Sequence, residues 1–280
     1  TAQPATPYWY RVRATGCANS GYSNVASVTT PAEPCNSLAF NQSANGGYVT
    51  FGAAPLLDAS NFTIETWFMR TGAGMVTSTG AGGSSQLGLL NVVPLVSKGR
   101  GEGDGGLIDC NYFLGIQNMP NVVLAADYEH DATSNNNHAV VGTTVIQNNV
   151  WYHAAATYDG ATLRIYLNGT LEGQIAATPA PRPDLTQHAG LATALTSGGV
   201  AQGSFAGRLD EARIWNLART QAEIRATINS QLASPQGGLI GRWGLNEIAG
   251  TTVIATAGTT TNGTLVGSQP SQWDRAVCAP

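Results

Sequence analysis

The chain has 280 residues and only 11% of them are charged, against about 25% in an ordinary soluble domain. Its 13 Lys and Arg and 17 Asp and Glu give a net charge of -4, and cations this sparse do not form the basic surface that nucleic-acid phosphates require. A hydrophobic content of 42% excludes a disordered chain, and no run approaches the ~18 apolar residues of a membrane-inserted helix. The sequence therefore predicts a globular protein with one large domain and a small additional part.

The N-terminal segment predicts a β-hairpin. Large and polar residues alternate over 8–14 and again over 23–30, with a glycine-containing turn between them, and a period of two is typical of strands. The segments Tyr-Trp-Tyr-Arg-Val-Arg-Ala and Tyr-Ser-Asn-Val-Ala-Ser-Val resemble the last two strands of a fibronectin type III domain. We therefore assign residues 1–33 to the C-terminal hairpin of such a domain and a proline-containing linker. A lone hairpin is marginal in water and residues 1–10 have no signal-peptide pattern, so we expect a piece of a longer secreted protein.

Residues 34–280 predict an all-β domain, a two-sheet antiparallel jelly-roll sandwich. Short stretches rich in β-branched and aromatic residues alternate with Gly, Asn and Ser loops, a pattern typical of sandwiches. One helix is predicted at 219–231, because Thr220 and Glu223 have the spacing of a capping box before an apolar face. The expected strands are 48–51, 62–70, 95–97, 112–117, 122–128, 143–146, 151–158, 162–167, 171–176, 208–215, 239–244 and 263–266.

Four cysteines fit a secreted, oxidised protein, because no Cys-x-x-Cys pair is present for zinc or redox chemistry. We expect a disulfide between Cys35 and Cys278, which flank the large domain, and a second between Cys17 and Cys110. The first bond would close a loop of about 240 residues, and the chain-entropy model assigns such a loop about 5 kcal/mol of stabilisation. Buried free thiols are the alternative.

Four segments in the large domain resemble a known family. They are Asn-Phe-Thr-Ile-Glu-Thr-Trp-Phe at 61–68, Asn-Tyr-Phe-Leu-Gly-Ile at 111–116, Val-Trp-Tyr-His-Ala-Ala-Ala-Thr-Tyr-Asp-Gly at 150–160 with Leu-Arg-Ile-Tyr-Leu-Asn-Gly at 163–169, and Phe-Ala-Gly-Arg-Leu-Asp-Glu-Ala-Arg-Ile-Trp-Asn at 205–216. Together they resemble a laminin G-like module of the concanavalin A-like lectin/glucanase superfamily. The resemblance implies a concave sheet with rim loops that bind glycans or proteins, often with calcium, in secreted bacterial proteins. A fold by itself does not name a ligand.

Six of the 17 acidic residues fall in two short segments, and the segment around Asp127 is the first candidate calcium site. Asp127, Glu129 and Asp131 alternate at a predicted strand end, so that all three would share one face. Neighbouring carboxylates repel unless a cation or open water intervenes, and hard oxygen ligands suit calcium. The alternative is a solvated strand end and turn.

The second acidic segment is the glycine-rich loop at 99–110, which could curl around a cation through the carboxylates of Glu102, Asp104 and Asp109 and through backbone carbonyls. It lacks the ligand spacing of an EF-hand loop, and a flexible rim loop is the alternative. Asp210 is a third candidate metal ligand, in the strand that resembles the family's Asp-Glu-x-Arg-Ile element. A carboxylate there must have a partner if it faces inward, so a structural ion pair is equally consistent with the pattern.

Candidate ligand-binding residues lie beside these acids. Tyr128 could stack on a sugar ring, and His138 closes the polar loop that follows it. Gln187 and His188 raise the alternative of a polysaccharide lyase, since some jelly-roll lyases resemble this pair in using Gln-x-His with a tyrosine base. Here the two residues are adjacent, and the Glu-x-Asp-x-x-Glu strand of the related glucanases has no match. The pattern favours a protein without catalytic activity.

We therefore expect an extracellular or cell-surface binding module that recognises a glycan or a cell-surface protein in adhesion, with calcium as its cofactor. Its other partners would be the neighbouring domains of the same polypeptide. A structural spacer or assembly domain of an adhesin or filament is one alternative, and a polysaccharide lyase or glycosidase is another.

Overall fold

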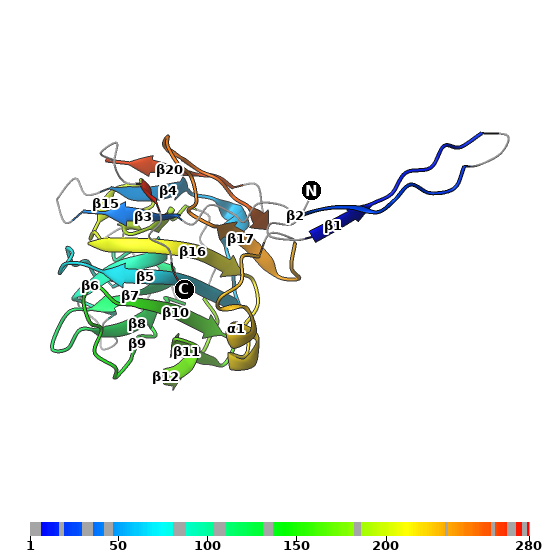
Figure 1. Ribbon diagram of the computed structural model, residues 1–280. Helices are drawn as coiled ribbons and strands as arrows, with labels where there is room; N and C mark the ends of the chain where they lie inside the picture. The colour runs from blue at the N-terminus through cyan, green and yellow to red at the C-terminus, as the bar shows by residue number, and fades with distance from the viewer. Residues whose placement is uncertain are drawn as a thin grey trace. The chain divides into compact units, whose positions relative to one another are not determined.

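A computed structural model describes the chain except for residues 1–6, 17–19, 30–35, 42–46, 81–87, 103–109, 131–136, 182–185, 233–234, 259–260, 268–272, 276–278 and 280. The chain divides into two compact units, Thr1–Cys35 and Asn36–Pro280. In the first unit, β1 (Pro7–Tyr10) pairs with β2 (Ala26–Thr29) as an antiparallel hairpin (Figure 1). A hairpin is therefore present, but its strands are shorter than the predicted stretches 8–14 and 23–30, and its resemblance to a fibronectin type III domain stays a prediction.

The second unit is a sandwich of two antiparallel sheets, which confirms the predicted all-β jelly-roll class (Figure 1). In the first sheet the strand order is β12-β11-β10-β5-β16-β17-β19, with β3 beside β16 and β21 beside β3. Its strands are β3 (Asn36–Phe40), β5 (Phe62–Arg70), β10 (Trp151–Tyr158), β11 (Thr162–Leu167), β12 (Thr170–Ala176), β16 (Gly207–Trp215), β17 (Leu239–Trp243), β19 (Ala257–Gly258) and β21 (Trp273–Arg275).

In the second sheet the order is β18-β20-β4-β13-β6-β7-β8-β9. Its strands are β4 (Tyr48–Gly52), β6 (Val92–Gly99), β7 (Cys110–Gln117), β8 (Val123–Asp127), β9 (Val140–Val141), β13 (Ala189–Leu191), β18 (Thr252–Val253) and β20 (Gly263–Val266). A separate pair, β14 (Ala194–Leu195) with β15 (Ala201–Gln202), and the short 3-10 helix Pro55–Leu57 complete the described elements.

The core lies between the two sheets and follows from the period of two along each strand. On β5, Phe62, Ile64 and Phe68 are fully buried in this core, whereas Glu65 and Trp67 lie on the opposite face of the same strand. Phe62 also packs against aromatic rings from strands of both sheets. The alternation therefore separates an apolar interior from a polar outer layer.

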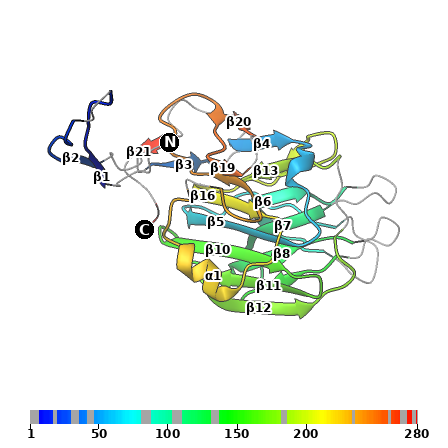
Figure 2. The same cartoon turned by 90° about the vertical axis from the view of Figure 1, so that its right-hand side faces the viewer.

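The helix α1 (Gln221–Thr227) covers the outer face of the first sheet, across β10 and β11 (Figure 2). Ile224 packs against Ala155 and Tyr166. Thr220 and Glu223 form the predicted capping box, but the helix is shorter than the predicted 219–231. No helix in the described part of the chain is long and apolar enough to cross a membrane.

Part of the outer face of the second sheet is covered by the loop that carries Leu89 and by β14. Leu89 and Ala194 pack over Val92 of β6, Phe113 of β7 and Ala125 of β8 as a small buried cluster. The family resemblance implies an open concave sheet, and in this region the sheet is instead an apolar contact surface.

One predicted strand, at 143–146, is absent. The backbone N–H groups of Thr143 and Thr144 donate to the Glu172 carboxylate, at 3.1 and 2.9 Å, instead of to a neighbouring strand. The pairing with β8 is made two residues earlier, by β9. A distant side chain has thus replaced the hydrogen bonds that a strand would have supplied.

Candidate functional site

Asp127 and Glu129 lie together under the covering loops of the second sheet. Asp127 ends β8, Glu129 follows two residues later, and both side chains are 0% exposed. Glu129 pairs with Asn137 in an antiparallel bridge, and the Asn137 amide Nδ2 donates to Asp127 Oδ2 at 3.2 Å. The bridge thus places the Asn137 amide against the Asp127 carboxylate.

The hydrogen bonds of Asp127 fall on one of its two carboxylate oxygens. Oδ2 accepts from Thr79 Oγ1 at 2.5 Å and from the Leu89 backbone N–H at 3.4 Å, besides the bond from Asn137. Asp127 Oδ1 and Asn137 Oδ1 are both buried without a hydrogen-bond partner. Such groups are rare because an unsatisfied buried oxygen costs about 1–3 kcal/mol. The cluster therefore has unused capacity for a donor or a cation.

The charges around Asp127 also leave room for a cation. Among the described residues no lysine or arginine forms an ion pair with it. Burial raises the pKa of Asp127 from 3.8 to about 7, although the Thr79 hydroxyl and the backbone N–H groups of Leu89, Tyr128 and His138 oppose the rise. A bound cation would supply the missing compensation and keep the carboxylate ionised.

Two glycines let the covering loop approach this cluster. A Cβ atom added to Gly80 would lie 2.6 Å from Asn137 Oδ1, and one added to Gly88 would lie 2.5 Å from Thr79 Oγ1. Both distances are too short for a real side chain. The polar cluster is therefore built from close backbone contact as well as from side chains.

Sequence reasoning named Asp127 and Glu129 as candidates and missed their neighbours Thr79 and Asn137. Thr79 lies 48 residues from Asp127 along the chain, and nothing near it in the sequence indicates a site. Asn137 ends a polar run of asparagines beside the predicted His138, and that run was the available signal. Asp104, Asp109 and Asp131 lie outside the described residues, so their proposed roles stay predictions.

Asp210, the third metal candidate, is tied to the C-terminal segment. Its Oδ2 accepts from the Ala279 backbone N–H at 3.0 Å, and burial raises its pKa to about 7. Within the described part of the chain no group of three or more His, Cys, Asp or Glu side chains is gathered to hold a metal ion, around Asp210 or around Asp127 and Glu129. At Asp210 the geometry thus favours the alternative of a structural anchor.

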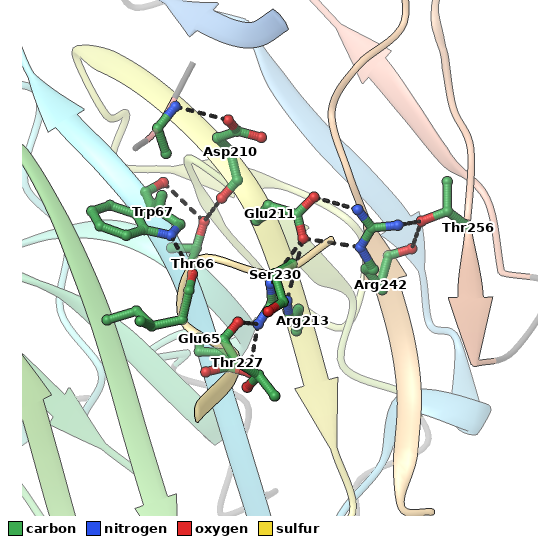
Figure 3. Close-up of polar contacts among 12 residues, drawn as sticks. Glu65, Thr66, Trp67, Asp210, Glu211, Arg213, Thr227, Ser230, Arg242 and Thr256 are labelled. Carbon is green, nitrogen blue, oxygen red and sulfur yellow. Dashed lines mark hydrogen bonds and ion pairs between the residues drawn. The ribbon is translucent and has the colours of Figure 1, made fainter. Parts of the chain in front are cut away.

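The neighbouring Glu211 joins a buried charge network (Figure 3). It sits at a bulge of β16 with φ of 51°, which turns its carboxylate between two arginines. Arg213 Nη2 donates to Glu211 Oε2 at 3.0 Å and Arg242 Nε donates to the same oxygen at 2.9 Å. Bidentate pairing of this kind compensates the burial of all three charges.

Glu65 extends the network beneath α1. Arg219 Nη1 lies 3.1 Å and Arg213 Nη1 lies 3.5 Å from Glu65 Oε1, and His153 Nε2 lies 3.4 Å from Oε2. Burial alone would raise the pKa of Glu65, but the contacts with His153, Arg213 and Arg219 lower it to about 2. These paired charges hold the helix to the sheet, and none of them is open to a substrate.

The structure corrects the prediction that Tyr128 stacks on a sugar ring. Its side chain is fully buried in the core, 4.7 Å from the ring of Tyr158, and its hydroxyl donates to the Pro179 carbonyl at 3.0 Å. Because alternate residues of a strand face opposite sides, the placement of Asp127 beneath the loops turns Tyr128 inward. It cannot stack on a sugar in this structure.

His138 is half-buried at the end of the same turn. Its Nε2 lies 2.8 Å from His130 Nδ1, and its ring packs against that of Tyr128. Burial, together with the charge of His130, lowers the pKa of His138 to about 4. It is therefore a neutral side chain next to the cluster, and its predicted contact with a ligand stays a prediction.

Gln187 is buried just before β13, and His188 beside it is half-buried. The side-chain Nε2 of Gln187 donates to Glu102 Oε2 at 3.1 Å, and the backbone carbonyl of Gln187 accepts from Lys98 Nζ at 2.6 Å. Glu102 also accepts from the Ser197 backbone N–H at 2.8 Å. These bonds join rim loops to each other, which is a structural role for Gln187.

Only one of the four cysteines lies in the part of the chain that the structure describes. Cys110 is buried in β7, and Cys17, Cys35 and Cys278 lie outside the described residues. Both predicted disulfides therefore stay predictions.

The fold and the matching sequence define the class of the protein. Residues 43–225 match the family described as the concanavalin A-like lectin/glucanases superfamily, and the chain belongs to that family of laminin G-like domains. This confirms the resemblance for the large domain.

Individual relatives are distant or short. A structure from Bacteroides ovatus, provisionally assigned as a carbohydrate binding protein, is 17% identical over 100% of this chain and 71% of its own, with a TM-score of 0.57. The carbohydrate-binding module of a Ruminococcus gnavus sialidase, bound to α2,3-sialyllactose, is 14% identical over 69% of this chain and 94% of its own, with a TM-score of 0.44. Mouse pappalysin-1 is 35% identical over 78 residues, which are 26% of this chain and 4% of pappalysin-1.

Proposed function

We propose that the unit Asn36–Pro280 is a non-catalytic, extracellular carbohydrate-binding module whose binding of glycans in adhesion is assisted by calcium. Membership of a superfamily that contains lectins supports the glycan as ligand. The observation that carries the cation is the pair of buried, unpartnered oxygens, Asp127 Oδ1 and Asn137 Oδ1.

The donor set fits calcium among the common cations. Carboxylate, amide and hydroxyl oxygens are hard ligands, and calcium accepts six to eight of them in flexible arrangements. Asp127, Glu129, Asn137 and Thr79 supply such oxygens on three separate stretches of chain. A cation there would fasten the covering loops to the second sheet and so fix the shape of the rim.

Calcium titration tests the cation. At a concentration 100 times the Kd, a bound ion stabilises the folded state by about 2.7 kcal/mol, so we expect calcium to raise the Tm of the protein by several degrees. Asp127→Asn removes the charge without changing the size of the side chain, and should abolish the shift. Asp159→Asn, in an exposed turn, is the matched control and should keep it. A wild-type Tm that is unchanged in millimolar calcium would rule out the cation.

A glycan array read with and without a chelator tests the ligand. Binding that weakens on chelation supports the whole proposal, and binding that does not weaken supports a glycan module without calcium. An array without any signal would favour the spacer or assembly role. Release of unsaturated or reducing ends from uronate polymers would contradict the absence of catalysis.

A further inference from the structure

Arg70 ends β5 at the rim of the sandwich, and two asparagines from other loops hold its side chain. Nη1 donates to Asn148 Oδ1 at 2.8 Å and Nη2 donates to Asn118 Oδ1 at 3.5 Å. Asn118 is itself fixed, because its backbone N–H donates to the Asn91 carbonyl at 2.9 Å and its Nδ2 donates to the Ala73 carbonyl at 3.0 Å. The guanidinium therefore has a defined place at the meeting point of these loops.

The charge of Arg70 is not compensated within the described part of the chain. The buried Arg213, Arg219 and Arg242 each pair with a glutamate, and the exposed Arg164 pairs with Asp159. Arg70 is half-buried and meets only neutral amides, and burial lowers its pKa. Among the described residues, Arg70 thus lacks the anionic partner that Arg164, Arg213, Arg219 and Arg242 have.

The guanidinium also has donors to spare. It carries five N–H groups in a planar fork, and the two asparagines occupy two of them. The remaining N–H groups match the two oxygens of a carboxylate, which is the ligand that this fork binds best.

Apolar side chains are exposed on the same loops. Met119 is 66% exposed beside Asn118, Leu90 is 51% exposed beside Asn91, and Val150 is 43% exposed. Val150 follows Asn149, whose backbone N–H donates to the Arg70 carbonyl at 2.7 Å. A pyranose ring presents apolar C–H faces together with polar groups, so an exposed apolar rim around one cation suits a sugar that carries a carboxylate.

We infer that this rim, formed by Arg70, Asn118, Asn148 and the exposed Met119, binds the carboxylate of an acidic sugar, a uronate or a sialate. The inference rests on the proposed glycan-binding function and names the class of glycan. The subsite is separate from the cation cluster, because Asn118 precedes β8 and Asp127 ends that strand.

The experiment compares each acidic glycan with its own methyl ester, using an oligogalacturonide and sialyllactose as probes in isothermal titration calorimetry. Losing a charge-assisted hydrogen-bonded partner weakens binding by about 10- to 100-fold, so the wild-type chain should bind at least one acid tighter than its ester by that factor. Arg70→Gln should make acid and ester equal, and Arg70→Lys should retain part of the preference. Arg164→Gln is the matched control and should leave the preference unchanged. The Tm of each variant reports whether it is folded.

An acid preference that depends on Arg70 and falls with added salt supports the inference. An acid preference that survives in folded Arg70→Gln, or binding of neutral glycans alone, overturns the inference and leaves the proposed function standing. Equal Arg70-dependent binding of a polyglutamate peptide would make the rim a general anion site and contradict the sugar. Failure to bind any glycan would overturn the proposed function as well.

Discussion

Glu65 and Asp127 show how neighbours decide the state of a buried carboxylate. Both side chains are fully buried, yet the pKa of Glu65 falls to about 2 and that of Asp127 rises to about 7. Burial pushes both values upward; only Glu65 has arginines and a histidine that outweigh it. A carboxylate compensated by the protein is structural, whereas one left uncompensated is the better place to look for a ligand.

Removing the Glu65 charge should therefore be costly. Glu65→Gln leaves Arg213 and Arg219 buried with a poorer partner, and breaking such a pair costs about 3–5 kcal/mol of unfolding free energy. Because the folded pKa of Glu65 is below its unfolded value of 4.5, its contribution is present above pH 4.5 and is lost as the pH falls toward 2. Urea unfolding at pH 6, 4 and 3 should show a gap between wild type and variant that narrows with acid.

The control for this prediction is the exposed pair of Arg164 and Asp159. Arg164→Gln should cost about 0–1 kcal/mol. A loss in Glu65→Gln no larger than in this control would show that the buried network contributes little to stability.

At the scale of elements, α1 illustrates how a short helix depends on its surroundings. Isolated helices shorter than about 12–15 residues are marginal in water, and α1 spans only Gln221–Thr227. Its capping box satisfies two backbone donors, and Ile224 buries its apolar face on the sheet. The capping box therefore fixes where the helix begins, and the packing of Ile224 on the sheet stabilises it.

Removing the N-cap of α1 separates the contribution of the capping box from that of packing. Thr220→Ala deletes the hydroxyl that accepts from the Glu223 backbone N–H, and loss of such a cap typically costs about 1 kcal/mol. Thr220→Ser keeps the hydroxyl and should remain close to wild type in thermal unfolding. Equal destabilisation by both variants would mean that packing of the Thr220 methyl group, and not the cap, is responsible.

At the scale of the whole molecule, the two ends of the sandwich domain are neighbours. β3 pairs with β21 in the first sheet, with Asn36 opposite Arg275. Cys35 precedes the first of these strands and Cys278 follows the second. This pairing supports the predicted disulfide, which would close the domain through its longest loop.

Peptide mapping without reduction should accordingly recover Cys35 linked to Cys278. A loop of about 240 residues corresponds to about 5 kcal/mol of stabilisation in the chain-entropy model, so a reducing agent should lower the Tm markedly. Cys17→Ser should leave the Cys35–Cys278 peptide intact. Recovery of Cys35 linked to Cys17, or alkylated without prior reduction, would contradict the prediction.

The sequence by itself determined the class of fold, three long strands of the first sheet and the capping box that starts the helix. Phe62–Arg70, Trp151–Tyr158 and Thr162–Leu167 are predicted to the residue, because alternation and capping are local patterns with fixed periods. Only the tertiary structure placed Thr79 and Asn137 on Asp127, buried Tyr128, and gathered two asparagines around Arg70. These contacts join residues far apart in the chain, so they depend on strand order and loop packing, which no local period encodes.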